Sequence, residues 1–338
     1  MSTVYLVGVG STSFKRQPER SHKELVREAI LSTLGDAQCS DGQKIDSLWF
    51  GTAAMAVFGQ STVGGQVCMA PLVEDGILGK HVPVMNVEGG CATGSVAVHG
   101  AWKDILTGQH DFSLAVGVDK TFIPQHPEKM LTLFDGAIDQ LDANATTHWY
   151  EKQAARCGLN WSPHDKRSLL MDICVMQAEF HMRQFGVSAK DIAAGAAKNY
   201  AHGVLNPKCG IDNGLNIQEV LDARSVLGPL TRPMCASVND GAAAVLLCGD
   251  KGLGRLSVDV RQRALRVSAS VLGGGSWRSL EERSSVVTTA RKAYGMAGLE
   301  PNHIDVVELH DATSFAELSL VESLGFCDLG EGARYICE

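Results

Sequence analysis

The stretch VEGGCATGS, residues 87–95, places Cys91 between a pair of glycines and the start of a helical pattern. The apolar residues before it predict a strand, so Cys91 would lie at the first turn of a helix, where N–H groups favour a thiolate. Gly90 would let a carbonyl approach the backbone, and the Cys91 N–H could stabilise an oxyanion there. The pattern indicates a nucleophile, although the commoner role of cysteine, a small buried apolar residue, also fits.

The pair His310 and Asp311 ends the apolar stretch DVVELHD, which predicts a buried strand. Open α/β sheets bind ligands at the edge where their strands end, so this pair would face a ligand. A histidine there could donate a hydrogen bond, hold a water molecule, or act as an acid or a base. A structural histidine near the start of the next helix explains the same residues.

Weaker candidates lie in two further stretches. Lys198, Asn199 and His202 occur in KNYAHGVLNP and could lie at one helix end near a ligand, although a solvated helix face fits them equally. The glycine run that begins at Gly273 follows a predicted strand and could approach a phosphate, but it lacks the Gly-x-Gly-x-x-Gly spacing and a Walker lysine. The Asn-Asp-Gly sequence at 239–241 predicts a turn before a strand.

The elements around these residues predict an α/β fold. Helical patterns alternate with nearly continuous apolar stretches, which are typical of parallel strands covered on both faces. Ser21 and Glu24 form a capping pattern at the start of one predicted helix. After residue 254 a second series begins, and its HIDVVELHDA matches KIDSLWFGTA of the first. We interpret the two series as a duplication of a βαβ-rich half.

The duplication divides the chain into three predicted parts. They are an N-terminal half at residues 1–121 and 239–253, an inserted loop domain at 122–238, and an incomplete C-terminal half at 254–338. The inserted part contains long loop-like segments of the kind that is often functional. By its spacing, the counterpart of Cys91 in the second half would lie beyond Glu338, so we expect that half-site to be missing.

The composition argues against several functional classes. The formal net charge of -8, without a basic stripe, disfavours nucleic acid or an anionic membrane as a partner. Ten cysteines are scattered singly with no Cys-x-x-Cys pair, which predicts neither a metal site nor a redox motif. This scatter is typical of reduced thiols in a cytoplasmic protein, and no apolar stretch is long enough to span a bilayer.

Five stretches together resemble the thiolase superfamily: NVEGGCATGS, EFHMRQFG, AAKNYAHGVLNP, SVNDGAAAVLL and VVELHDATSFAEL. Their order and spacing are most similar to the sterol-carrier-protein-2 type, the nonspecific lipid-transfer thiolases. The His-Asp pair of ELHDATS is the specific mark of that branch. The resemblance extends over residues 4–326 and implies a layered α-β-α-β-α fold, built from two similar halves with a loop domain inserted in the first.

The resemblance also implies roles for particular residues. Cys91 matches the nucleophile that takes the acyl group from a 3-oxoacyl-CoA as a thioester, and its N–H contributes to an oxyanion hole. His310 matches the residue that positions a water or an oxygen in the other oxyanion hole. Coenzyme A or an acyl-CoA is then a substrate, no cofactor is bound covalently, and a homodimer or homotetramer is the implied assembly. The candidates for binding coenzyme A are Lys198, Asn199, His202 and Gly273.

Two family motifs, Gly-His-Pro and Cys-x-Gly, do not occur in this sequence. In the family they supply the histidine that activates the nucleophile and the cysteine that shuttles the proton. Thr313 also stands where the family usually has phenylalanine or a relative of it. Three hypotheses stay open: an acyl-CoA C-acyltransferase, a retro-aldolase that cleaves a sterol side-chain CoA thioester with an OB-fold (zinc-ribbon) partner subunit, and a non-catalytic acyl-CoA-binding subunit. The intact Cys91 argues against the aldolase, which forms no acyl-enzyme.

Overall fold

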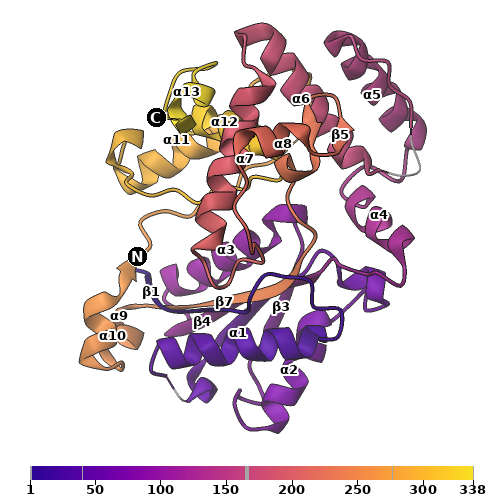
Figure 1. Cartoon of the computed structure of the whole chain (residues 1–338). Helices are drawn as coiled ribbons and strands as arrows, with labels where there is room; N and C mark the ends of the chain where they lie inside the picture. The colour runs from indigo at the N-terminus through magenta and orange to yellow at the C-terminus, as the bar shows by residue number, and fades with distance from the viewer. Residues whose placement is uncertain (1, 40, 164–166, 276, 338) are drawn as a thin grey trace. The chain divides into compact units, whose positions relative to one another are not determined.

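The computed structural model describes residues 2–39, 41–163, 167–275 and 277–337 of the chain (Figure 1). The chain divides into two units, each with a core of its own. The first unit comprises Met1–Pro127 and Val238–Leu272, and the second comprises Glu128–Ser237 and Gly273–Glu338. The boundary between Leu272 and Gly273 falls inside the predicted C-terminal half, so the structural units differ from the predicted parts there.

A mixed β-sheet forms the centre of the first unit. Its strands are β1 (Tyr5–Ser11), β2 (Ser47–Gly51), β3 (Val84–Val87), β4 (Phe112–Lys120), β7 (Asp240–Cys248) and β8 (Leu265–Arg266). They lie side by side in the order β3, β2, β4, β7, β1, β8. Strands β2, β3 and β4 are parallel, whereas β7 runs antiparallel to β4 and β1, and β8 runs antiparallel to β1. The predicted α/β class is confirmed, and among the described strands the parallel arrangement is limited to β2, β3 and β4.

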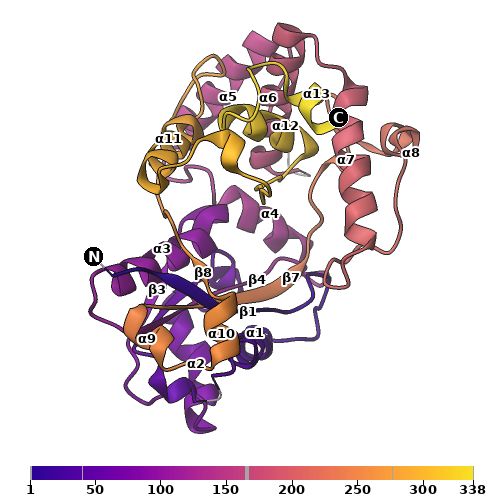
Figure 2. The ribbon, with the colours of Figure 1, turned by 90° about the vertical axis from the view of Figure 1, so that its left-hand side faces the viewer.

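Helices cover both faces of this sheet (Figure 1, Figure 2). α1 (His22–Asp36) and α2 (Gly64–Glu74) pack on one face, and α3 (Thr93–Leu106) packs on the other. Successive side chains of β2 belong to different cores, because Leu48 and Phe50 pack with α1 and α2 while Trp49 packs with α3. Two short helices, α9 (Asp250–Gly254) and α10 (Val258–Arg263), follow β7.

The predicted capping pattern before α1 is present. The Ser21 hydroxyl accepts a hydrogen bond from the Glu24 backbone N–H at 3.2 Å, and the Glu24 carboxylate accepts one from the Ser21 N–H at 2.8 Å. Leu25 and Ile30 of this helix are fully buried against the sheet. The capping pattern in the sequence therefore marks the start of a helix that the structure also packs against the sheet.

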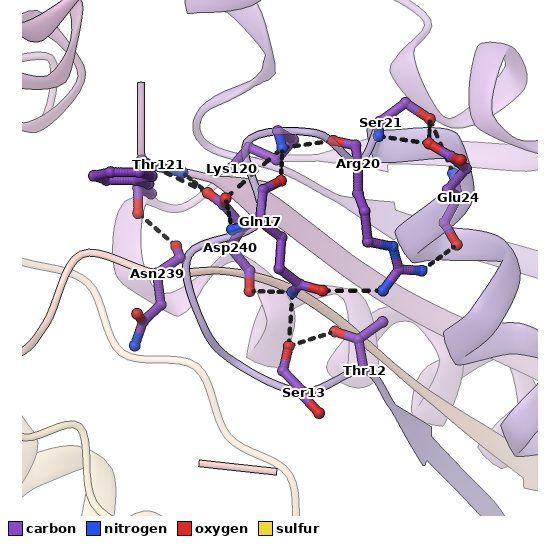
Figure 3. A network of polar contacts seen from close by, with 11 residues as sticks. Thr12, Ser13, Gln17, Arg20, Ser21, Glu24, Lys120, Thr121, Asn239 and Asp240 are labelled. Carbon is purple, nitrogen blue, oxygen red and sulfur yellow. Dashed lines mark hydrogen bonds and ion pairs between the residues drawn. The ribbon is translucent and has the colours of Figure 1, made fainter. Parts of the chain in front are cut away.

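A buried ion pair fastens two loops to the sheet (Figure 3). Lys120 ends β4 and Asp240 begins β7; their side chains are 5% and 0% exposed, and Lys120 Nζ lies 3.7 Å from Asp240 Oδ2. The Asp240 carboxylate accepts hydrogen bonds from the backbone N–H groups of Gln17 at 2.8 Å and Thr121 at 2.9 Å. The Lys120 ammonium donates to the backbone carbonyls of Gln17 and Arg20. The segments after β1 and after β4 are thus both attached to the start of β7.

The second unit is mainly helical. Its elements are α4 (Pro127–Asp135), α5 (Ala143–Cys157), α6 (Leu169–Phe185), α7 (Ala189–Val204), α8 (Ile217–Asp222), α11 (Ser285–Ala297), α12 (Ser314–Ser323), α13 (Gly332–Cys337) and the strands β5 (Ser225–Leu227) and β6 (Leu230–Thr231). The first residue of α4, Pro127, still belongs to the first unit. One core joins α6, α7, α8 and α12, and a smaller aromatic cluster between α5 and α6 includes Tyr150 stacked on Trp161, with ring centroids 5.2 Å apart. None of the described helices of the chain is both long enough and apolar enough to cross a membrane.

The strand predicted over residues 305–311 is not present. In the described part of the chain this stretch has no strand partner, and Val306 is 81% exposed. A strand needs a neighbour for its N–H and C=O groups. β8, from the start of the predicted second series, pairs with β1 of the first unit instead. The prediction was wrong because an apolar pattern does not reveal whether a neighbouring strand is available.

Candidate active site

Cys91 lies at the edge of the sheet where the parallel strands β2, β3 and β4 end. It belongs to a 3-10 turn, Gly90–Ala92, which follows β3 and leads directly into α3. The residue is exposed. Because ligands approach open α/β sheets at the carboxyl ends of the strands, a substrate can reach a side chain at this edge. The sequence predicted the helix start, and the structure adds the turn before it.

Two side chains fix the backbone around Cys91. The buried Thr93 hydroxyl accepts a hydrogen bond from the Gly89 N–H at 2.9 Å and donates one to the Gly90 carbonyl at 2.6 Å. The Glu88 carboxylate accepts a hydrogen bond from the Gly90 N–H. Gly90 itself has a φ of +57°, in the left-handed region that favours glycine. The turn therefore presents Cys91 in a defined backbone geometry.

Asp119 organises the neighbouring loop, which follows β2. Its carboxylate accepts hydrogen bonds from the Thr52 hydroxyl and the Ala54 N–H, both at 2.8 Å. Burial raises the pKa of Asp119, these hydrogen bonds oppose the shift, and the charge of Glu88 adds to it. The Glu88 charge therefore acts on the Asp119 carboxyl group, and Glu88 is part of the turn region that carries Cys91. Neither was predicted from the sequence; an acidic residue at the end of an apolar strand is the signal that could have found Asp119.

The other cysteines lie in different surroundings. Cys337 is the other exposed cysteine. Partial burial of its thiol group is the largest cause of a raised pKa there. Burial also raises the pKa of Cys68 to about 11 and that of Cys248 to about 12, which keeps these thiols protonated at neutral pH. The buried cysteines are Cys39, Cys68, Cys157, Cys235 and Cys248. Among the cysteines, only Cys91 combines exposure with a position at a helix start.

The second unit brings together side chains from α7 and from the start of α12. Lys198 Nζ donates to Glu317 Oε1 at 2.6 Å and to Asn199 Oδ1 at 2.8 Å. Asn199 Nδ2 donates to Glu317 Oε2 at 2.8 Å and to Asp311 Oδ2 at 3.2 Å. We call Lys198, Asn199, Asp311 and Glu317 the α7–α12 cluster. Predicted site residues from two distant stretches thus meet here, and His310 directly precedes the cluster in the chain.

The cluster contains one ammonium group, that of Lys198, and two carboxyl groups, those of Asp311 and Glu317. Glu317 is only 9% exposed, and its carboxylate faces the Lys198 ammonium. Partial burial of its carboxyl group raises the pKa of Asp311, the Glu317 charge raises it further, and His310 and Lys198 act in the opposite direction. Asp311 is therefore protonated more readily than an ordinary aspartate, although the residue as a whole is exposed.

Backbone contacts hold the segment that follows Asp311. The Ala236 N–H donates to the Ala312 carbonyl at 3.0 Å, and Cys235 and Thr313 form an isolated antiparallel bridge. The Thr313 hydroxyl caps α12 by accepting a hydrogen bond from the Ala316 N–H at 3.3 Å. The threonine at position 313 therefore has a structural role that phenylalanine could not fill.

Glu317 was not predicted from the sequence. It lies in SFAELSL, an otherwise mostly apolar stretch that forms a buried helix. A carboxylate at a buried helical position requires a partner, and Lys198 is that partner. A lone glutamate in an apolar helical stretch is the signal that could have found it.

Two predicted residues lie elsewhere in the second unit. His202 is exposed near the end of α7, where its backbone carbonyl accepts a hydrogen bond from the Leu205 N–H at 3.0 Å. At Gly273 a Cβ would lie 2.0 Å from the Thr289 hydroxyl of α11, so close packing against that helix requires glycine. Neither residue belongs to the α7–α12 cluster.

The chain matches two family descriptions along most of its length. Residues 4–251 match "Thiolase, N-terminal domain", and residues 275–338 match "Thiolase C-terminal domain-like". The chain belongs to the thiolase family. The resemblance inferred from the sequence motifs is confirmed, and the C-terminal match includes His310 and α12.

The chain is similar to several proteins of this family. It is 27% identical to the benzoylsuccinyl-CoA thiolase subunit BbsB of Thauera aromatica, over 98% of this chain and 78% of that protein. It is 27% identical to an acetyl-CoA acetyltransferase of Methanothermobacter thermautotrophicus, over 99% and 80%. It is 29% identical to sterol carrier protein 2 of Homo sapiens, over 98% of this chain and 58% of that protein. Among solved structures, the Ltp2-ChsH2(DUF35) aldolase has the same fold, with a TM-score of 0.70 and 20% identity over 99% of this chain and 80% of that one.

Proposed function

We propose that this thiolase is an acyl-CoA C-acyltransferase with Cys91 as its nucleophile. The observation that carries the proposal is the exposed Cys91 in a fixed turn at the start of α3, at the carboxyl edge of the parallel strands. A helix start favours a thiolate through its N–H groups and dipole. The family match and the similarity to an acetyl-CoA acetyltransferase support this reaction class.

In the direction of cleavage, the Cys91 thiolate attacks the 3-oxo carbon of a 3-oxoacyl-CoA. The carbonyl becomes an alkoxide, which the Cys91 N–H stabilises. The alkoxide then collapses, the bond between the second and third carbons breaks, and the released acetyl-CoA carbanion takes up a proton. The acyl group stays on Cys91 as a thioester until coenzyme A accepts it. In this scheme His310 donates a hydrogen bond to an oxygen of the substrate or to a water.

The proposal extends to partners and location. Coenzyme A would contact the second unit, where Lys198 and Asn199 are the candidates. We propose a homodimer or homotetramer, or a complex with a partner subunit. The relative BbsB is named a subunit, and the solved aldolase structure is named for Ltp2 together with ChsH2(DUF35), which supports the partner. The cytoplasm is the proposed location, on the basis of the singly scattered cysteines.

Intact-mass spectrometry tests the role of Cys91. The protein incubated with a 3-oxoacyl-CoA should gain the mass of one acyl group, and Cys91→Ala should gain none. Cys337→Ala removes the other exposed cysteine and is the matched control, which should still be acylated. An adduct on Cys91→Ala, or no adduct on the unaltered protein, contradicts the proposal.

A retro-aldolase is the second candidate, because the Ltp2-ChsH2(DUF35) aldolase shares the fold. That reaction cleaves a carbon–carbon bond without an acyl-enzyme. Release of a ketone or an aldehyde from a sterol side-chain CoA thioester, with no adduct on Cys91, would support it. Tight binding of coenzyme A with neither an adduct nor a released carbonyl compound would instead support a non-catalytic subunit.

A further inference from the structure

We propose that Glu317 is a positioning residue that fixes the α7–α12 cluster and through it the segment that carries His310. The inference rests on the proposed function, in which His310 contacts the substrate. Glu317 is not itself placed next to the reacting atoms. Its role is to hold Lys198 and Asn199 so that Asp311, the neighbour of His310, keeps one position.

Glu317 uses both of its carboxylate oxygens. Oε1 accepts the hydrogen bond from Lys198 Nζ at 2.6 Å, and Oε2 accepts the one from Asn199 Nδ2 at 2.8 Å. Lys198 and Asn199 are adjacent in the chain, so a single carboxylate on α12 binds two neighbouring side chains of α7. Hydrogen bonds to a charged carboxylate are stronger than neutral ones, and burial at 9% exposure strengthens them further.

Asn199 connects Glu317 to Asp311. Its amide oxygen accepts a hydrogen bond from Lys198, and its amide nitrogen donates to both carboxylates. The reversed amide would place its oxygen against two carboxylates and its nitrogen against an ammonium, so the partners determine this orientation. Asn199 cannot rotate without losing contacts to all three partners. The Asp311 carboxylate is therefore bound by an amide that Glu317 and Lys198 hold in place.

The charges of the cluster act on Asp311 in opposite directions. Glu317 of α12 raises the pKa of Asp311, whereas Lys198 of α7 and the neighbouring His310 lower it. The other elements packed around α7 also carry charged or titratable side chains: Glu219 and Asp222 on α8, Arg334 and Cys337 on α13, and Arg232 on the 3-10 turn η4 (Arg232–Met234). Loss of the Glu317 charge should therefore lower the pKa of Asp311, and loss of the Lys198 charge should raise it.

Carbon-detected NMR titration of the Asp311 carboxyl group in the full chain tests these signs. Glu317→Gln keeps the size of the side chain and removes its charge, so the Asp311 titration should move to lower pH. Lys198→Met removes the ammonium, so the titration should move to higher pH. Glu322→Gln is the matched control, because Glu322 is a buried carboxylate on the same helix that contacts His181 at 3.0 Å. That variant should leave the Asp311 titration unchanged.

The rate of Cys91 acylation gives a second readout. Glu317→Gln should slow the appearance of the acyl adduct by up to ~10²-fold, the effect of a displaced group at an active site. Asn199→Ala, which leaves the buried carboxylate in place, should slow it similarly and serves if Glu317→Gln does not fold. An unchanged Asp311 titration in Glu317→Gln and Lys198→Met, or acylation as fast as in the unaltered protein, overturns the inference. If neither the unaltered protein nor any variant forms an adduct, the proposed function fails. The titration then still decides whether Glu317 holds Asp311.

Discussion

Gly90 sets the backbone from which Cys91 projects. Its φ is +57°, and a Cβ built on it would meet no atom within 4 Å. An alanine at this position would therefore meet no steric clash but would be strained in the left-handed region, which costs ~1–2 kcal/mol. The backbone can relieve this strain by a change of φ at position 90, which turns the peptide units on the two sides of that residue relative to each other. One of these units carries the Cys91 N–H, the proposed oxyanion donor.

Gly90→Ala should therefore lower the rate of Cys91 acylation by up to ~10²-fold, because that N–H moves away from its position. The fitting control is Gly108→Ala at the other end of α3, where φ is +75° and a Cβ would have an ordinary contact of 3.5 Å. It should lose a similar amount of stability in thermal unfolding and keep its acylation rate. Equal acylation rates in the two variants would contradict a role for the turn in catalysis.

The residues of the site differ in how far the sequence could predict them. Cys91 could be found because its glycines, its strand and its helix are adjacent to it in the chain. Glu317 could not be found in this way, because its partners Lys198 and Asn199 are 119 and 118 positions away in the chain. A hydrogen bond over such a separation depends on how α7 and α12 pack.

At the scale of elements, the pair Lys120 and Asp240 attaches loops to strands. Both side chains are almost completely buried, so removal of one leaves the other charge without its partner in a medium of low polarity. Asp240 also accepts hydrogen bonds from the backbone N–H groups of Gln17 and Thr121. These donors would lose their acceptor if Asp240 were replaced by an apolar residue. The ends of β1 and β4 and the start of β7 therefore depend on this one carboxylate.

Asp240→Ala should reduce the free energy of unfolding of the first unit by about 3–5 kcal/mol. The double variant with Lys120→Met should recover part of this loss, because no unpaired ammonium stays buried. Hydrogen exchange of peptides from β4 and β7 measures both effects. Asp75→Ala provides the comparison, since its ion pair with Arg27 is exposed on both sides and should contribute about 1 kcal/mol or less. A loss for Asp240→Ala as small as that for Asp75→Ala would show that the pair is not needed.

At the scale of the whole molecule, Cys91 belongs to the first unit and His310 to the second. In the proposed reaction the two residues have different roles, so their variants should have different effects. His310→Ala should slow Cys91 acylation by ~10²–10³-fold, the typical effect of losing one oxyanion donor, and should keep the binding of coenzyme A. Cys91→Ala should abolish acylation altogether.

Stopped reactions analysed by intact mass, with calorimetry for coenzyme A, distinguish these outcomes. His303→Ala is a suitable control for His310→Ala, because His303 is exposed on the same segment and its ring accepts a hydrogen bond from the Glu300 N–H at 2.9 Å. It should be acylated at the normal rate. Normal acylation of His310→Ala would remove that residue from the reaction.

The sequence by itself determined the α/β class, the capped helix α1, and the position of Cys91 after a strand and before a helix, since each depends on residues close together in the chain. Only the tertiary structure decided that β7 runs antiparallel beside β4, that residues 305–311 form no strand, and that Lys198 and Asn199 meet Asp311 and Glu317. A strand exists only where a neighbour accepts its hydrogen bonds, and a buried charge is stable only where the fold brings it a partner. Both conditions are set by contacts between distant segments.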